Sequence, residues 1–130
     1  MSWWQILPIG PTGYGNSPYQ SDSTFAGNPD LIDLEELMEM GLLTREDCRP
    51  LEKGAKADRV CFETLHAQKA KVLQLAFERA RNREIWKQVE QFRIKESRWL
   101  EDDALYRALK EQLPQPWQQW DEEIRLRRPQ

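Results

Sequence analysis

The residues best suited to chemistry in this sequence lie in one loop, Gly10–Ser21. It places Tyr14 and Tyr19 among glycines, prolines and small hydroxyl side chains. An exposed aromatic ring can cover the apolar face of a sugar, while Ser, Tyr and Gln side chains bond its hydroxyl groups. The loop is therefore a candidate sugar-binding surface. A structural loop whose tyrosines only cover neighbouring chain is an equally open interpretation.

Glycines at positions 10, 13 and 15 also invite comparison with phosphate-binding loops. Such loops end in Gly-Lys-Ser/Thr and run directly into a helix, because backbone N–H groups and the helix N-terminus bind the phosphate. This loop has no such ending, and no helix is predicted to open at Gly15. The pattern favours a sugar over a phosphate.

Other polar clusters are interpreted as helix surface. Neighbouring residues on a helix do not converge on one point, so adjacent carboxylates in charged segments are expected to face solvent. The pairs are Glu35–Glu36, Asp102–Asp103 and Asp121–Glu122. His66, the only histidine, is expected on a helix surface, and with Cys61 it makes too few ligands for zinc, which needs three or four. We predict no metal site and no cofactor.

The element expected to position the loop is the apolar run over residues 2–9. Its length and its Trp and Ile content favour a strand buried on both faces, as in a parallel sheet. Sites in parallel α/β folds are built at the C-terminal ends of such strands. The rest of the chain offers no partner strand, so the neighbours of this one are expected to lie outside these residues.

Helices are predicted beyond residue 30. Asp33 and Glu36 fit a capping box and Gly41 a helix stop, while Thr44 with Asp47 indicates a second, short helix. Apolar residues at three-and-four spacing predict further helices over 65–83, around 85–92 and over 100–109, the last ending before Pro114.

Composition excludes several classes of partner. With 19 basic and 22 acidic residues the net charge is -3, which gives no general attraction to nucleic acid or anionic membranes. The longest apolar run is far shorter than the ~18 residues of a membrane span, and no export signal is recognised. Cys48 and Cys61 are too few for a disulfide scaffold, so two reduced thiols and a cytoplasmic location are expected.

Several segments resemble the signature of glycoside hydrolase family 77, the amylomaltases or 4-alpha-glucanotransferases of the alpha-amylase clan. The most specific are Trp4-Gln5-Ile6-Leu7-Pro8, Gly10-Pro11-Thr12-Gly13-Tyr14-Gly15, Ser17-Pro18-Tyr19-Gln20-Ser21 and Phe25-Ala26-Gly27-Asn28-Pro29. Supporting matches downstream are Trp99-Leu100-Glu101-Asp102, Ala104-Leu105-Tyr106, Ala108-Leu109-Lys110, Pro116-Trp117 and Trp120. The resemblance spans essentially the whole chain.

This resemblance implies a fold class. The chain would be an N-terminal-region fragment of a (β/α)₈ TIM barrel, mostly α-helical, with one buried barrel strand near its start. Residues 1–29 would hold that strand and an active-site loop, and residues 30–130 a helical insertion of the same catalytic domain. A barrel of this kind needs about 250 residues. The remainder of the same polypeptide would therefore be a partner of this segment.

The resemblance also implies an activity in starch, glycogen or maltodextrin metabolism. Enzymes of the family transfer α-1,4-glucan segments between maltodextrins with retention, through a covalent glycosyl-enzyme. That mechanism needs two carboxyl groups roughly 5 Å apart. In the family they come from later barrel strands, so this chain would hold no catalytic residue and would be inactive alone.

Four residues carry over as glucan-binding residues by their place in the family's motifs. Tyr19 would line the subsite of the transferred glucosyl unit, with Ser17 close by. Tyr14 would belong to an accessory glucan-contact surface, to which Phe62 would add a second ring. The family usually has Asp before that ring, where this chain has Cys61, and an aromatic residue where it has Asp103. The alternative functions are a non-catalytic glucan-binding module and a helical interaction protein, although both would leave the predicted strand without neighbours.

Overall fold

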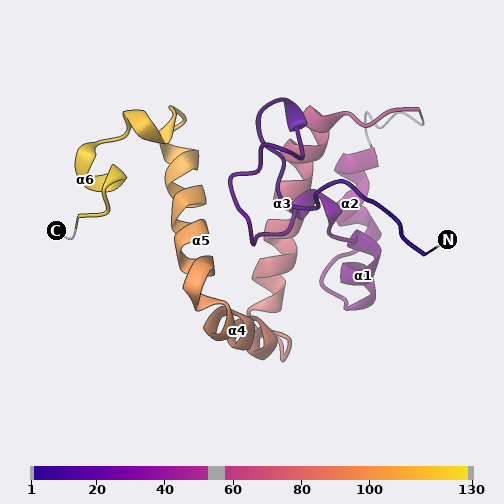
Figure 1. Ribbon diagram of the computed structural model, residues 1–130. Helices are drawn as coiled ribbons and strands as arrows, with labels where there is room; N and C mark the ends of the chain where they lie inside the picture. The colour runs from indigo at the N-terminus through magenta and orange to yellow at the C-terminus, as the bar shows by residue number, and fades with distance from the viewer. Residues whose placement is uncertain (1, 53–57, 129–130) are drawn as a thin grey trace. The chain divides into compact units, whose positions relative to one another are not determined.

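The computed structural model describes residues 2–52 and 58–128, and the chain divides into two compact units, residues 1–92 and 93–130. All regular structure in these ranges is helical (Figure 1). The first unit holds η1 (Tyr14–Asn16), η2 (Pro29–Leu31), α1 (Leu34–Glu39), α2 (Arg45–Glu52), α3 (Phe62–Ala80) and most of α4 (Trp86–Lys95). The second holds α5 (Ser97–Gln112), η3 (Trp117–Gln119) and α6 (Glu122–Arg125).

The predicted buried strand over residues 2–9 is wrong. No strand occurs in the described parts of the chain, and this segment is irregular and exposed, with Trp3 at 92% and Trp4 at 88% exposure. A strand forms only when a neighbouring strand completes its hydrogen-bond ladder. An apolar run that has no neighbouring strand here stays exposed. The bond of Asn28 N–H to the Ile9 carbonyl, 3.1 Å, closes the loop that follows but forms no ladder.

The start and stop of α1 lie where the sequence predicted them, although the cap bond comes from Glu35 rather than from Glu36 as in the predicted capping box. The Asp33 carboxylate accepts a hydrogen bond from the backbone N–H of Glu35 at 2.8 Å, which caps the first turn. Gly41 ends the helix in the left-handed region, at a φ of 68°. The reversal lets the N–H groups of Leu42 and Leu43 bond the Leu37 carbonyl and turns both leucines inward.

A reciprocal cap opens α2, as the spacing of Thr44 and Asp47 predicted. The Asp47 carboxylate accepts hydrogen bonds from the Thr44 N–H and hydroxyl, both at 2.7 Å, while Thr44 Oγ1 accepts from the Asp47 N–H at 3.3 Å. Arg79 of α3 donates to the same carboxylate at 2.6 Å and to the Leu42 carbonyl at 3.0 Å. This pair therefore joins α2, α3 and the turn between α1 and α2.

The Asp47–Arg79 pair predicts a pH-dependent stability. Hydrogen bonds from Arg79 first, and then from Thr44, hold the pKa of the Asp47 carboxyl well below its usual range. A pKa lowered by folding contributes stability above the unfolded value of about 3.9, and that stability is lost as the pH falls below it. Asp47→Asn should therefore lower the melting temperature at pH 7, and the deficit should shrink as the pH falls below about 4.

Glu46→Gln is the matched control for thermal unfolding followed across this pH range. Glu46 lies on the same turn, but its ion pair with Arg49 is 71% exposed on the glutamate side, and exposed pairs contribute little. If Asp47→Asn and the unsubstituted protein had the same melting temperature at every pH, the Asp47 carboxylate would not stabilise the fold.

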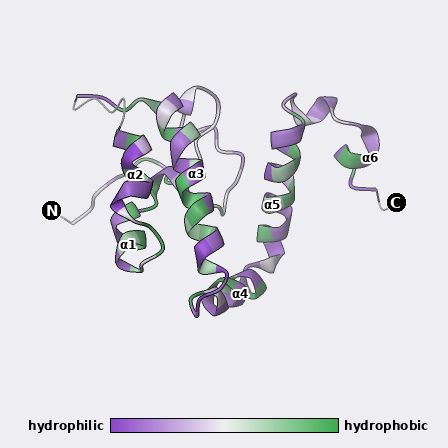
Figure 2. Ribbon diagram, turned by 180° about the vertical axis from the view of Figure 1, so that it is seen from behind, coloured by the Kyte–Doolittle hydropathy of each residue, from purple (hydrophilic) through white to green (hydrophobic). Residues whose placement is uncertain are grey.

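The core of the first unit lies between α3 and the segment from α1 to α2. Its buried residues share one apolar face of α3 and the turn and helix facing it: Leu42, Leu43, Cys48, Val72, Ala76 and Ala80. Hydrophobic residues recur along α3 in Figure 2. The helix begins three residues before the predicted start at residue 65 and ends three residues before the predicted end at residue 83. Cys61 is its N-terminal cap residue, and the chain turns after Ala80.

In the second unit, α5 and the turns that follow it form a smaller packing centre. Helix α5 ends before Pro114 as predicted, because proline cannot continue a helix and restricts the residue before it. Trp120 is buried, its indole N–H donates to the Gln115 carbonyl at 3.1 Å, and its ring lies 5.6 Å from that of Tyr106.

Across both units, none of the described helices combines the length and apolar character that a bilayer crossing requires.

Candidate functional site

The loop that follows the exposed N-terminal segment is closed at its base by the bond between Ile9 and Asn28. Within it, the one-turn helix η1 is held by its own backbone. The Gly13 N–H bonds the Ser17 carbonyl at 3.0 Å, and the Asn16 N–H bonds the Gly13 carbonyl at 3.1 Å. Gly15 and Asn16 have φ values of 67° and 59°, the left-handed region that glycine and asparagine accept most readily. This turn carries Tyr14, whose side chain is 92% exposed.

Gly13 fits the loop because it lacks a side chain. A Cβ at this position would overlap the backbone carbonyl oxygen of Gln20 and lie 2.8 Å from the Gln20 carbonyl carbon. The two segments of the loop that contain Gly13 and Gln20 therefore approach more closely than any other residue type at position 13 would allow.

Tyr19 lies on a hollow formed by the loop itself. The hollow has a volume of about 610 Å³, and its lining includes Ile9, Pro18, Tyr19, Ser21 and Phe25. Tyr19 is 73% exposed, so its ring can be covered by a ligand. The Ser17 hydroxyl accepts a hydrogen bond from the Tyr19 backbone N–H at 3.3 Å, which ties the two predicted residues together. Ser17 has the extended backbone, φ -74° and ψ 123°, that the following proline favours.

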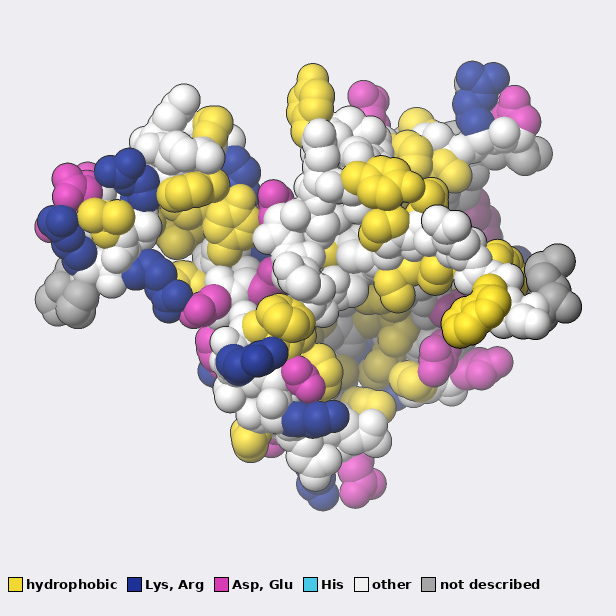
Figure 3. All heavy atoms as spheres, in the orientation of Figure 1, with side chains coloured by type: hydrophobic (Ala, Val, Ile, Leu, Met, Phe, Trp, Pro, Cys, Tyr) yellow, Lys and Arg dark blue, Asp and Glu magenta, His cyan; other side chains and the backbone are white. Residues whose placement is uncertain are grey.

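Exposed apolar and aromatic side chains are plainly visible on the face drawn in Figure 3. Among the residues of the loop and its base, Ile9, Tyr14, Tyr19 and Phe25 are exposed. Aromatic rings beside Ser and Gln side chains combine apolar surface with hydrogen-bonding groups. A sugar ring has the same combination of apolar faces and hydroxyl groups.

Phe62, the fourth predicted residue, opens α3 and is 42% exposed. Its ring stacks on His66 one turn later, with ring centroids 6.0 Å apart and planes inclined by 27°. Cys61, where the family pattern has Asp, lies at the N-terminal cap with its thiol 3.3 Å from the Thr64 hydroxyl. Phe62 therefore presents a ring but no hydroxyl on this side of the helix.

His66 has contacts that the sequence did not indicate. Its Nε2 lies 3.0 Å from Oδ1 of Asn16, and its Nδ1 lies 3.1 Å from a carboxylate oxygen of Asp30. The imidazole thus connects η1, η2 and α3. It was predicted to be a helix-surface residue, and it does keep 43% of its side chain exposed.

Lys69 is a second residue that sequence reasoning left without a role. Its ammonium group donates to the carbonyls of Asp30 at 2.6 Å and Ile32 at 2.8 Å, and the residue is only 7% exposed. Burial lowers the pKa of Lys69, while the carboxylates of Asp30 and Asp33 act in the opposite direction. The bonds fix the segment after the loop onto α3.

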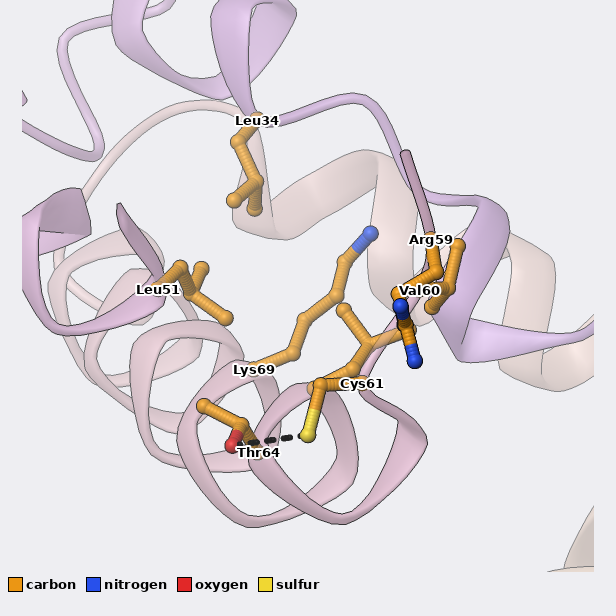
Figure 4. A pocket seen from close by; sticks show the side chains of 8 residues that line it. Leu34, Leu51, Arg59, Val60, Cys61, Thr64 and Lys69 are labelled. Atoms are coloured by element: carbon orange, nitrogen blue, oxygen red, sulfur yellow. Dashed lines mark hydrogen bonds between the residues drawn. The ribbon is translucent and has the colours of Figure 1, made fainter. Parts of the chain in front are cut away.

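A pocket of about 360 Å³ adjoins Lys69. In Figure 4 the Lys69 side chain extends across it from α3, with Leu34 and Leu51 to one side and Arg59 and Val60 to the other. The burial of Lys69, though not the identity of its partners, could have been predicted from the sequence, since the residue falls on the apolar stripe of α3 between Leu65 and Val72.

The adjacent carboxylates engage separate partners. Asp102 forms a bidentate pair with Arg127 at 2.7 and 2.9 Å, and Asp103 pairs with Arg107 one turn along α5 at 2.6 Å. The bond from Arg127 lowers the pKa of the Asp102 carboxyl. In residues 2–52 and 58–128, no three His, Cys, Asp or Glu side chains gather closely enough to hold a metal ion.

Comparison with known proteins gives one consistent result. The sequence model of the Glyco_hydro_77 family, described as 4-alpha-glucanotransferase, matches residues 1–130. The chain is 44% identical to the 4-alpha-glucanotransferase of Thermus thermophilus over 129 residues, which is 96% of this chain and 25% of the relative. It is 41% identical to that of Aquifex aeolicus, over 97% of this chain and 25% of the relative.

A plant relative is more distant. The chloroplastic/amyloplastic 4-alpha-glucanotransferase of Arabidopsis thaliana is 34% identical over 95% of this chain and 22% of its own length. The chain thus spans about a quarter of the curated relatives it matches. The match over its whole length, together with the identity to these relatives, shows that the chain belongs to the 4-alpha-glucanotransferase family, glycoside hydrolase family 77.

Proposed function

We propose that the chain is a glucan-contacting segment of a 4-alpha-glucanotransferase that transfers α-1,4-glucan segments between maltodextrins with retention. The observation that carries the proposal is the family match over residues 1–130, in a chain whose tyrosine loop has the exposed rings that a sugar needs. The two carboxyl groups of a retaining mechanism would come from parts of the enzyme outside this segment. The matched relatives, of which the chain spans about a quarter, leave room for them.

Within this proposal the loop residues have different tasks. Tyr19, on the 610 Å³ hollow, and Ser17, which is bonded to the Tyr19 backbone, would contact the glucosyl unit that is transferred. Tyr14, exposed on its own turn, and Phe62, at the start of α3, would contact glucan farther from the reacting bond. Lys69 would support the segment that follows the loop, and His66 would support the η1 turn. A cytoplasmic location belongs to the same proposal and rests on a cysteine count too low for a disulfide scaffold, Cys48 and Cys61 alone.

The proposal is tested by comparing two proteins on maltotriose. A complete enzyme that carries these 130 residues as its corresponding segment should convert maltotriose into glucose and longer maltodextrins. The 130-residue chain alone should give none of these products, because it supplies neither the nucleophile nor the acid/base. Chromatography of the products measures both.

The Thermus thermophilus enzyme with its matching segment exchanged for this chain is a suitable complete enzyme, since the two segments are 44% identical. The unmodified Thermus enzyme is the control for assay conditions. A folded exchange enzyme that produced no transfer products would contradict the proposal. Transfer products from the purified 130-residue chain would contradict the expectation that its catalytic groups lie elsewhere.

A further inference from the structure

His66 occupies a junction that the glucan-binding residues do not explain. Through Nε2 it contacts Asn16, two residues after Tyr14, at 3.0 Å. Through its ring it stacks on Phe62, at 6.0 Å between centroids. One side chain therefore touches the turn that carries the first ring of the accessory surface and the second ring itself.

The η1 turn needs such an external contact. Its internal bonds define its shape but do not fix where it lies on α3. Tyr14 is 92% exposed, so its own ring does not attach the turn to the helix. Asn16, held in the left-handed region at a φ of 59°, instead directs its amide to His66.

Asp30 fixes the imidazole from the other side. Its carboxylate is 15% exposed and lies 3.1 Å from Nδ1, so a proton on Nδ1 is held there. Nε2 then faces the Asn16 amide, which can present Oδ1 to a protonated nitrogen or, after turning over, its NH₂ group to an unprotonated one. The contact between His66 and Asn16 is therefore available in either orientation of the Asn16 amide.

We propose that His66 is a positioning residue for long α-1,4-glucans, holding the Tyr14 turn against the start of α3 so that Tyr14 and Phe62 are presented as one surface. This inference rests on the proposed function, because the surface has a purpose only if the protein handles long glucans. His66 acts through Asn16 and Phe62 and is assigned no contact with the reacting atoms.

The test uses the complete enzyme that carries this segment, with amylose as the long substrate and maltotriose as the short one. His66→Ala should raise KM for amylose about fivefold, the worth of one neutral hydrogen bond, and leave kcat and KM for maltotriose within about twofold. Asn16→Gly keeps the left-handed backbone and removes the amide, and should have the same effect. The double variant should be no worse than His66→Ala alone, because Asn16→Gly removes only an interaction that His66→Ala has already removed.

Two controls separate positioning from general stability. Glu63→Ala, exposed on the same first turn of α3, should change neither KM. His66→Gln keeps a donor for Asn16 and should recover part of the amylose affinity. Equal rises of KM for both substrates, or additive effects of His66→Ala and Asn16→Gly, would overturn the inference in favour of a purely structural histidine. If His66→Ala fails to fold, Asn16→Gly with His66→Gln carries the same comparison.

Amylose binding measured by calorimetry distinguishes this inference from the proposed function. An enzyme without transfer activity whose Kd for amylose still rises about fivefold in His66→Ala and Asn16→Gly would reject the proposed function and support the role of His66. If Tyr14→Ala weakens amylose binding while the His66 and Asn16 variants bind normally, the accessory surface stands and His66 does not position it. An unsubstituted protein that does not bind amylose would overturn the inference.

Discussion

Tyr19→Ala, made in a complete enzyme that carries this segment, should lower kcat and kcat/KM together. The exposed Tyr19 side chain lies on the 610 Å³ hollow, and the Ser17 hydroxyl accepts a hydrogen bond from the Tyr19 backbone N–H. In the proposed enzyme this ring would pack on the reacting glucosyl unit and help to hold its distorted shape. A contact that is strongest in the transition state affects both kinetic constants. We expect a loss of about 2 kcal/mol or more, which is over tenfold in rate.

Two further variants make this prediction specific. Tyr19→Phe keeps the ring and should retain most of the activity if packing on the sugar is what matters. Tyr14→Ala should weaken apparent affinity for long glucans and leave turnover of maltotriose largely intact, because that ring lies on a separate turn. If Tyr19→Ala and Tyr14→Ala both raised only KM, the loop would be a general binding surface. If both left the kinetics unchanged and lowered the melting temperature, the tyrosines would be structural.

Gly13→Ala should be as damaging as the loss of the Tyr19 ring. The new methyl group would overlap the Gln20 backbone carbonyl, and no side-chain rotation relieves a clash with backbone. The turn must open, which moves the adjoining Tyr19 away from its hollow. We expect kcat/KM on maltotriose to fall tenfold or more. The melting temperature should change less than for a core substitution, because Gly13 lies outside the buried cluster.

Gly27→Ala is the matched control for the backbone clash, since Gly27 also lines the hollow but a Cβ there meets nothing within 4 Å. It should leave kcat/KM close to that of the unsubstituted enzyme. Steady-state kinetics on maltotriose for both alanine variants decides the point. Normal activity in Gly13→Ala would mean that the close approach of Gly13 to Gln20 is not needed for the site.

The helical part of the chain was predictable because its signals are local. The Asp33 cap, the Gly41 stop and the reciprocal Thr44–Asp47 cap each depend on residues at most three apart. The end of α5 before Pro114 was likewise predictable from the local sequence alone. Apolar spacing placed each end of α3 within three residues of its observed position. The start at Phe62 was missed because its cap residue, Cys61, is not a residue type that marks the beginning of a helix.

The strand prediction failed because it depended on partners. An apolar run over residues 2–9 is compatible with a strand, but the bonds that define a strand belong to its neighbours. The described residues provide none, and Trp3 is left 92% exposed. For the same reason the tertiary roles of His66 and Lys69 were missed. Their partners, Asn16 and Asp30, lie 50 and 39 residues away, beyond the reach of any helical or turn pattern.

The anchoring of the loop by Lys69 also bears on the order in which the molecule can assemble. The bond from Lys69 to the Asp30 carbonyl closes 39 residues of chain, and the entropy cost of closure grows with the length of free chain between the ends. Packing of α1 and α2 against α3, with Arg79 bonded to Asp47, removes most of that free length beforehand. Folding of the helices thus lowers the entropy cost of docking the tyrosine loop, and we expect the loop to dock after the helices have packed.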